Sequence, residues 1–147
     1  MVDLTATTPW RRTAVFPEYR DRSLSEVFHE LALACADRVA VRDGERSLTY
    51  RELHASIECV ATAVRERRNE PDDAPWVVTG VIGHGIEALV TVYGVMAAGA
   101  VLVPIDAGEP VERIAGIHHA GGAGLVVSTA AHPERVREAT GLRAEVF

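Results

Sequence analysis

The period of the apolar positions changes near the middle of the chain. Two N-terminal segments carry apolar residues three and four positions apart, and each opens with a serine or threonine followed three residues later by a glutamate. That arrangement is typical of amphipathic helices that begin with a capping box. It predicts helices over residues 23–36 and 49–68. Between them, residues 39–42 and 46–48 flank Asp43-Gly44, a dipeptide that favours a short β-hairpin.

The C-terminal half contains continuous apolar runs in place of alternating ones. Such runs suit strands that are buried on both faces of a parallel sheet, and helical segments between them suit crossover connections. The strands predicted are 76–82, 101–104 and 125–128, the helices are 86–97, 110–119 and about 132–139, and residues 143–147 look like the start of a fourth strand. The order predicts an α/β fold with a partial doubly wound, mostly parallel sheet flanked by helices, and with a short N-terminal β-hairpin.

The first 22 residues show no sustained period. They contain Pro9, Pro17 and scattered charges, which is typical of a flexible leader. We therefore expect two regions, a flexible leader over residues 1–22 and one globular unit over residues 23–147.

Composition narrows the possible functions. The 147 residues carry a net charge of -6, and all 15 basic residues are arginine. Without lysine there is no P-loop lysine, no Schiff-base lysine and no protein-kinase lysine. An acidic chain with no basic run argues against nucleic acid and anionic membranes as partners. Because no segment resembles a signal peptide or approaches the roughly 20 apolar residues of a membrane span, we expect a cytoplasmic protein. Cys35 and Cys59 are expected as reduced core residues.

Two glycine-rich segments are candidates for phosphate binding. Residues 80–85 follow the first apolar run and precede a helix, where free backbone amides can bind an anion. Their glycines stand in the reverse of the dinucleotide-binding order, and no acidic residue follows about 20 positions later. A structural strand-to-helix turn is therefore favoured over a nucleotide site. Gly121–Gly124 precedes a strand and predicts a helix C-cap and turn.

The remaining polar candidates do not form a recognisable site. Asp106 follows an apolar run and is the best placed carboxylate, but a lone aspartate there is more often a turn or capping residue. No pair among the six histidines has the spacing of a zinc site. His118 and His119 point about 100° apart on a helix, which predicts a solvated helix end. No Gly-x-Ser-x-Gly nucleophile elbow occurs. The residues alone thus predict no catalytic, cofactor-binding or metal-binding group.

Two longer motifs resemble a known family. Residues 48–53 read Leu-Thr-Tyr-Arg-Glu-Leu, similar to the family's Leu-Thr-Tyr-x-Glu-Leu, and residues 95–106 resemble its Leu-Lys-Ala-Gly-x-x-Tyr-Val-Pro-Leu-Asp core. Further segments at 39–41, 83–87 and 110–114 match in the same order. From about residue 16 onward the chain therefore resembles the N-terminal part of the adenylate-forming, AMP-binding superfamily, most of all the adenylation domains of nonribosomal peptide synthetases.

Three positions depart from the family core. Ala98 replaces a common lysine on a helix surface, and Val101 and Leu102 replace a more usual aromatic pattern. Acyl-CoA ligases share this looser pattern, so a fragment of such a ligase stays an alternative.

The resemblance implies an activity that these residues cannot supply alone. The complete family domain uses ATP and magnesium to convert an amino acid or another carboxylic acid to an acyl adenylate. Its phosphate loop, substrate pocket and catalytic lysine are expected beyond residue 147. We therefore expect a truncated subdomain that is inactive alone and binds no cofactor itself. The expected partners are a complementary C-terminal polypeptide or a carrier protein, with self-association through an unfinished face. The competing hypothesis is a non-catalytic Rossmann-like binding or interaction module.

Overall fold

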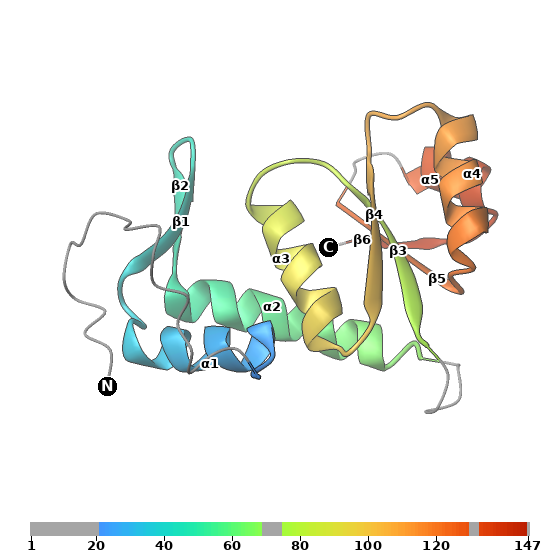
Figure 1. The fold of residues 1–147 in the computed structure, drawn as a ribbon. Helices are drawn as coiled ribbons and strands as arrows, with labels where there is room; N and C mark the ends of the chain where they lie inside the picture. The colour runs from blue at the N-terminus through green and yellow to red at the C-terminus, as the bar shows by residue number, and fades with distance from the viewer. Residues whose placement is uncertain (1–20, 69–74, 130–132, 147) are drawn as a thin grey trace.

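The computed structural model describes residues 21–68, 75–129 and 133–146. Helices and a hairpin come first in this structure, and strands then alternate with helices (Figure 1). The elements in chain order are α1 (Leu24–Ala34), β1 (Val39–Asp43), β2 (Arg46–Thr49), α2 (Tyr50–Arg65), β3 (Val77–Ile82), α3 (Ile86–Ala97), β4 (Val101–Asp106), α4 (Val111–Gly121), β5 (Leu125–Ser128), α5 (Pro133–Thr140) and β6 (Ala144–Val146). The predicted α/β class is confirmed. The predicted leader lies almost wholly outside the described residues.

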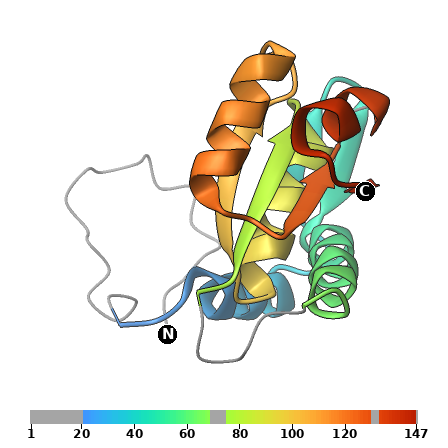
Figure 2. The same cartoon turned by 90° about the vertical axis from the view of Figure 1, so that its right-hand side faces the viewer.

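A parallel sheet with the strand order β4-β3-β5-β6 forms one end of the molecule. β3 pairs with β4 from Val77↔Val101 to Ile82↔Asp106, and with β5 from Val78↔Leu125 to Val81↔Ser128. The chain moves from β3 outward to β4 and then returns past β3 to β5. Its crossover helices consequently lie on opposite faces, with α3 on one face and α4 on the other (Figure 2). The doubly wound arrangement and the predicted fourth strand are both confirmed, since β6 pairs in parallel with β5.

Two apolar clusters occupy the two faces of the sheet. One joins α2 and α3 to the sheet and includes Leu53, Ile57, Val60, Val78, Val90 and Val95, while the other lies under α4 and α5 and includes Val81, Ile105, Ile114, Val126 and Val136. The central strands β3 and β5 are buried, as their continuous apolar runs predict. The same prediction is wrong for β4, whose Val101 is 56% exposed. β4 is an edge strand, so fewer neighbours cover it.

Both predicted capping boxes are present. Ser23 Oγ accepts a hydrogen bond from the Glu26 amide at 3.2 Å, and the Glu26 carboxylate accepts one from the Ser23 amide at 2.9 Å. At the start of α2, Thr49 and Glu52 make the same exchange at 3.3 and 2.8 Å. These backbone hydrogen bonds hold the pKa of both glutamates below the usual value, because they stabilise the ionised carboxylates. α1 and α2 end two and three residues before the predicted positions.

The hairpin turn lies one residue later than predicted. Asp43 pairs with Arg46 and closes the ladder, so the two loop residues are Gly44 and Glu45. Gly44 has φ +59°, a value that glycine adopts without steric cost. Tight hairpins often have a glycine with positive φ as the first of their two loop residues. Within the described ranges, no helix combines the length and apolar character needed to cross a membrane.

Candidate functional site

The carboxyl ends of the parallel strands define the place where a ligand is expected. In doubly wound sheets, ligands bind beyond these ends, where the strand order reverses direction. Here that point lies between β3 and β5, and it is bordered by the loop 83–85, the segment 107–110 and Thr129. The glycine segment and Asp106, which the sequence singles out, both lie at this edge.

One amide of the glycine loop is used inside the chain. The Gly83 amide donates to Thr129 Oγ1 at 2.8 Å and so ties the ends of β3 and β5 together. Gly85, with φ +92°, precedes α3 and offers no side-chain cap. The Glu87 carboxylate instead hydrogen-bonds its own backbone amide in the first turn of α3 and pairs with Arg46 at 2.6 Å. The amide and then the guanidinium lower the pKa of Glu87.

This arrangement favours the structural turn over the phosphate site. A helix N-terminus attracts an anion because its amides carry partial positive charge. In α3 a carboxylate of the chain already occupies that position, and a phosphate would have to displace it and its arginine partner. At this edge the Gly83 amide and the first turn of α3 are thus engaged by groups of the chain itself.

Asp106 acts as a turn residue at the same edge. Its Oδ1 accepts a hydrogen bond from the Gly108 amide at 2.6 Å, which closes the turn after β4. Its Oδ2 lies 3.6 Å from His84 Nε2, and the two side chains are 51% and 91% exposed. An exposed pair at this distance offers no desolvated general acid or base.

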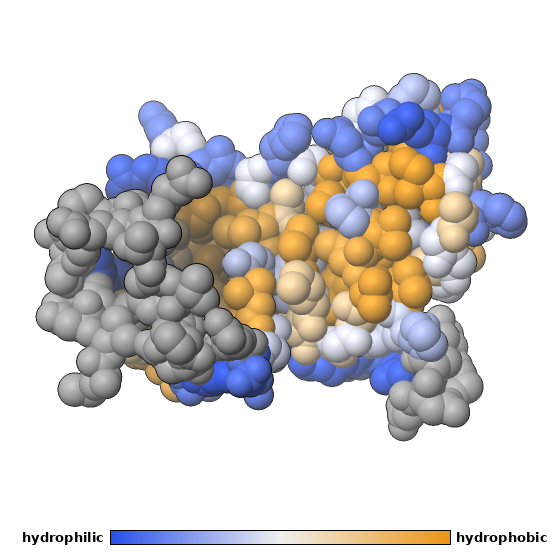
Figure 3. Space-filling model, in the orientation of Figure 1, coloured by the Kyte–Doolittle hydropathy of each residue, from blue (hydrophilic) through white to orange (hydrophobic). Residues whose placement is uncertain are grey.

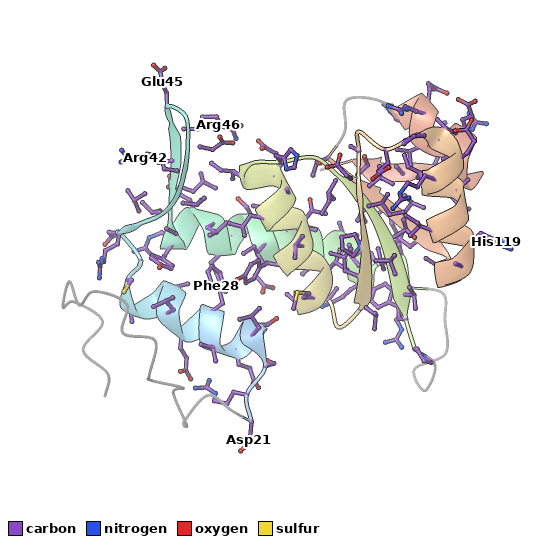
Figure 4. The ribbon with its side chains drawn as sticks, turned by 45° about the horizontal axis from the view of Figure 1, so that its top comes forward. Asp21, Phe28, Arg42, Glu45, Arg46 and His119 are labelled. Carbon is purple, nitrogen blue, oxygen red and sulfur yellow. The ribbon has the colours of Figure 1, made fainter. Side chains whose placement is uncertain are left out.

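The histidines differ from the sequence expectation at two places. His118 Nδ1 lies 2.9 Å from the hydroxyl of the buried Thr79 in β3, so it packs against the sheet, whereas His119 points away into solvent (Figure 4). Burial, and secondarily His119, lower the pKa of His118. His29 and His54 meet across α1 and α2, a contact that their separation of 25 residues does not predict. In the part of the chain that the structure describes, no group of three or more acidic, histidine or cysteine side chains could hold a metal ion.

The remaining predictions concern Gly122 and the two cysteines. Gly122 adopts φ +64° after α4, and its amide reaches the carbonyls of His118 and His119, which confirms a C-cap and turn. Cys35 is buried, as expected. Cys59 is exposed on α2, so the expectation that it is a core residue is wrong. Its position in the helix falls outside the apolar stripe that faces the sheet.

Comparison with known proteins connects the fold to a family. The model of the AMP-binding enzyme family matches residues 28–146. The chain is 36% identical over 120 residues to the probable non-canonical nonribosomal peptide synthetase CymA of Salinispora arenicola. It is also 36% identical over 116 residues to N-(5-amino-5-carboxypentanoyl)-L-cysteinyl-D-valine synthase of Amycolatopsis lactamdurans. These alignments cover 82% and 79% of the chain but only 2% and 3% of the two synthetases.

Solved structures agree with the sequence relatives. The nonribosomal peptide synthetase FmoA3, in a form bound to alpha-methyl-L-serine-AMP, matches with a TM-score of 0.73 and 30% identity. The N-terminal subdomain of Klebsiella oxytoca NpsA, in complex with anthranilyl-AMSN, matches with a TM-score of 0.65 and 26% identity. The matches cover 83% and 73% of this chain, and 14% and 27% of the two solved chains.

Proposed function

The chain belongs to the AMP-binding enzyme family, and from that membership we propose that it forms a structural part of a domain that activates a carboxylic acid as its acyl adenylate. An amino acid is the substrate class we favour, because the relatives named above are peptide synthetases. We assign this role to residues 23–147, since the first capped helix begins there. The family match over residues 28–146 is the observation that carries the proposal.

We further propose that these 147 residues do not form the adenylate alone. In that reaction a carboxylate oxygen attacks the α-phosphorus of ATP, and pyrophosphate leaves with the electron pair of the broken bond. The reactants must be held in line, and the negative charge of the phosphates must be stabilised. Two observations support the lack of activity: the sequence contains no lysine, and Glu87 and Thr129 already engage groups at the carboxyl edge. ATP and magnesium then belong to the complete domain.

Pyrophosphate exchange tests this directly. The purified chain is incubated with ATP, labelled pyrophosphate and each of a panel of amino and aryl acids, beside a complete adenylation domain as positive control. We expect exchange at the level of the no-enzyme blank, with a helical circular dichroism spectrum showing that the chain is folded. Acid-dependent exchange above the blank would overturn the proposal.

An apolar surface over β4 and α3 supports a docking role for this part (Figure 3). Its exposed large side chains are Met96, at 40%, and Val101, at 56%. β4 ends the sheet on this side, so one backbone edge of the strand has no paired strand among the described residues. A contiguous exposed apolar surface of this kind is typical of an interface.

The backbone of β4 limits what can cover this surface. The Val101 amide donates to the Trp76 carbonyl, just before β3, at 2.8 Å, and the Ala107 amide donates to the Ile82 carbonyl at 2.9 Å. By the two-residue period of a strand, the even-numbered positions of β4 therefore face the open edge. Pro104 occupies one of these positions and has no N–H. An added strand would lack a hydrogen bond at the centre of the edge, which favours side-chain packing over strand addition.

We propose that further polypeptide of an AMP-binding domain covers the surface over β4 and α3, in the same or a complementary chain. The lengths of the related chains support this proposal. This chain spans only 14% and 27% of the two solved chains named above, so most of each related chain has no counterpart in these residues. A carrier protein would then bind the complete domain.

Co-purification with the remaining part of a homologous adenylation domain tests this proposal. We expect a one-to-one complex by light scattering that Val101→Glu abolishes. Val39→Glu is the matched control, because Val39 is similarly exposed, at 51%, but lies on the hairpin strand β1. No complex with the wild-type chain would overturn the proposal. So would a homodimer of the wild-type chain that dissociates in Val101→Glu, because it would indicate a self-associating module.

A further inference from the structure

Two histidines from different helices form a direct contact in this fold. His29 Nδ1, on α1, lies 2.9 Å from His54 Nε2, on α2, and the ring centroids are 4.9 Å apart. At this distance the N–H of one ring donates a hydrogen bond, and the lone pair of the other ring nitrogen accepts it. At least one of the two rings must therefore be neutral for the contact to exist.

This contact joins α1 to α2 in addition to their apolar packing. Ala32 is the buried residue of α1, so the helix contributes little to the apolar core. Phe28 projects from α1 toward α2, where its ring stacks on His54 with centroids 6.2 Å apart, and it also meets Tyr50 and Tyr93 (Figure 4). His54 thus contacts α1 through both an aromatic ring and a hydrogen bond.

The charged groups around the histidines are already engaged with one another. Arg22 binds Glu30 at 2.7 and 2.8 Å, and Glu26 is held by the Ser23 amide in the capping box. On α2, Glu58 lies 3.8 Å from Arg65. On α3, the aromatic side chain near the pair is Tyr93. Among the described residues, each of the three nearby carboxylates therefore has a partner in the chain. Glu30 also interacts with His29, because Arg22 first and the charge of His29 to a smaller extent lower the pKa of the Glu30 carboxyl, so this carboxylate offsets part of the repulsion between two protonated rings.

We propose that the His29–His54 contact is a pH-sensitive latch that holds α1 on α2. The latch is closed while at least one of the two rings is neutral and accepts the hydrogen bond. When both rings are protonated, all their nitrogens are donors, the hydrogen bond loses its acceptor, and two adjacent cations repel each other. The closed state then holds one proton fewer than the open state. By linkage, the closing equilibrium falls as the pH falls, by at most about tenfold per pH unit.

Site-resolved hydrogen exchange of the full chain tests the latch. Protection factors for α1, corrected for the intrinsic pH dependence of exchange, are measured from pH 7.5 to 5. We expect α1 protection in the wild-type chain to fall as the pH is lowered across this range, by up to about tenfold per pH unit. The double variant His29→Gln/His54→Gln keeps a donor and an acceptor but cannot titrate, so its α1 protection should be nearly flat. His119→Gln, on the exposed side of α4, should behave as wild type.

Two results would overturn the latch. One is α1 protection in the wild-type chain that does not change with pH, and the other is an unchanged pH response in the double glutamine variant. If the double variant does not fold, the wild-type proton NMR titration decides the question. Coupled, two-step titration of the His29 and His54 ring protons supports the latch, and two independent single-step curves refute it. His118 lies on α4, so we expect any pH response that it causes in the protection of α4, where it is distinguished from the response of α1.

Discussion

Replacement of Gly94 by alanine should destabilise the fold, although alanine is the better helix former. Gly94 lies within α3, where that helix crosses α2. A Cβ at this position would lie 2.5 Å from Val60 Cγ1, 2.6 Å from Val60 Cβ and 3.2 Å from the Ile57 carbonyl oxygen. Val60 Cβ and the carbonyl are fixed to the backbone of α2, so no side-chain rotation relieves the overlap. The two helices would have to separate.

Two opposing terms set the magnitude. A glycine-to-alanine change in a helix gains about 1 kcal/mol from reduced backbone entropy. Overpacking a tight interface typically costs about 1–3 kcal/mol, and the upper part of that range applies because the obstacle is backbone and a branched Cβ. We therefore expect Gly94→Ala to lower the free energy of unfolding by about 1–2 kcal/mol.

The same substitution in α4 supplies the control. A Cβ at Gly116 meets nothing within 4 Å, so Gly116→Ala should raise stability by about 0.5–1 kcal/mol. Urea unfolding followed by circular dichroism and by the fluorescence of the buried Trp76 measures both variants. In the double variant Val60→Gly/Gly94→Ala both contacts with Val60 are removed and only the 3.2 Å contact with the Ile57 carbonyl oxygen remains, so we expect a favourable coupling of about 0.5–3 kcal/mol. Equal effects of the two alanines, or no coupling with Val60, would refute the packing argument.

Three further changes test other parts of the structure. Because the pKa of His118 is lowered in the folded chain, the His118 ring of the unfolded chain is protonated first as the pH falls. The free energy of unfolding should therefore decrease below about pH 6.5. Urea titrations at several pH values should show a smaller decrease for His118→Gln. Thr49→Ala removes the cap of α2 and should lower the free energy of unfolding by about 1 kcal/mol. Thr62→Ala, at an exposed position within the same helix, should not lower it measurably. Equal melting temperatures of the two variants would contradict this prediction. Pro104→Val restores an N–H to the open edge of β4 and should increase self-association in sedimentation velocity, and an unchanged sedimentation profile would show that the proline does not protect the edge.

Local rules account for most of what the sequence predicts correctly. The capping boxes at Ser23 and Thr49 depend only on residues three positions apart, and the helices start where those rules place them. The strands β3 and β5 are buried because their apolar runs have no polar face. Each of these predictions uses information contained within a few neighbouring residues.

The errors come from tertiary context. Val101 belongs to an apolar run like those of the central strands, but the sheet order places its strand at an edge. Cys59 follows a helical pattern but lies on the outer side of α2. The contacts His29–His54 and Thr79–His118 join residues 25 and 39 positions apart, and no periodicity encodes them. The occupation of the α3 N-terminus by Glu87 depends in turn on Arg46 from the hairpin.

The residues that identify the family in this chain are explained by architecture. Thr49 and Glu52 cap α2, Gly99 takes φ +85° at the end of α3, and Asp106 closes the turn after β4. Each of these roles concerns the local fold and involves no reacting group. A match to the family over residues 28–146 is therefore compatible with a chain that forms no adenylate. It follows that the informative experiments on this chain measure assembly with further polypeptide first, and turnover only in the assembled form.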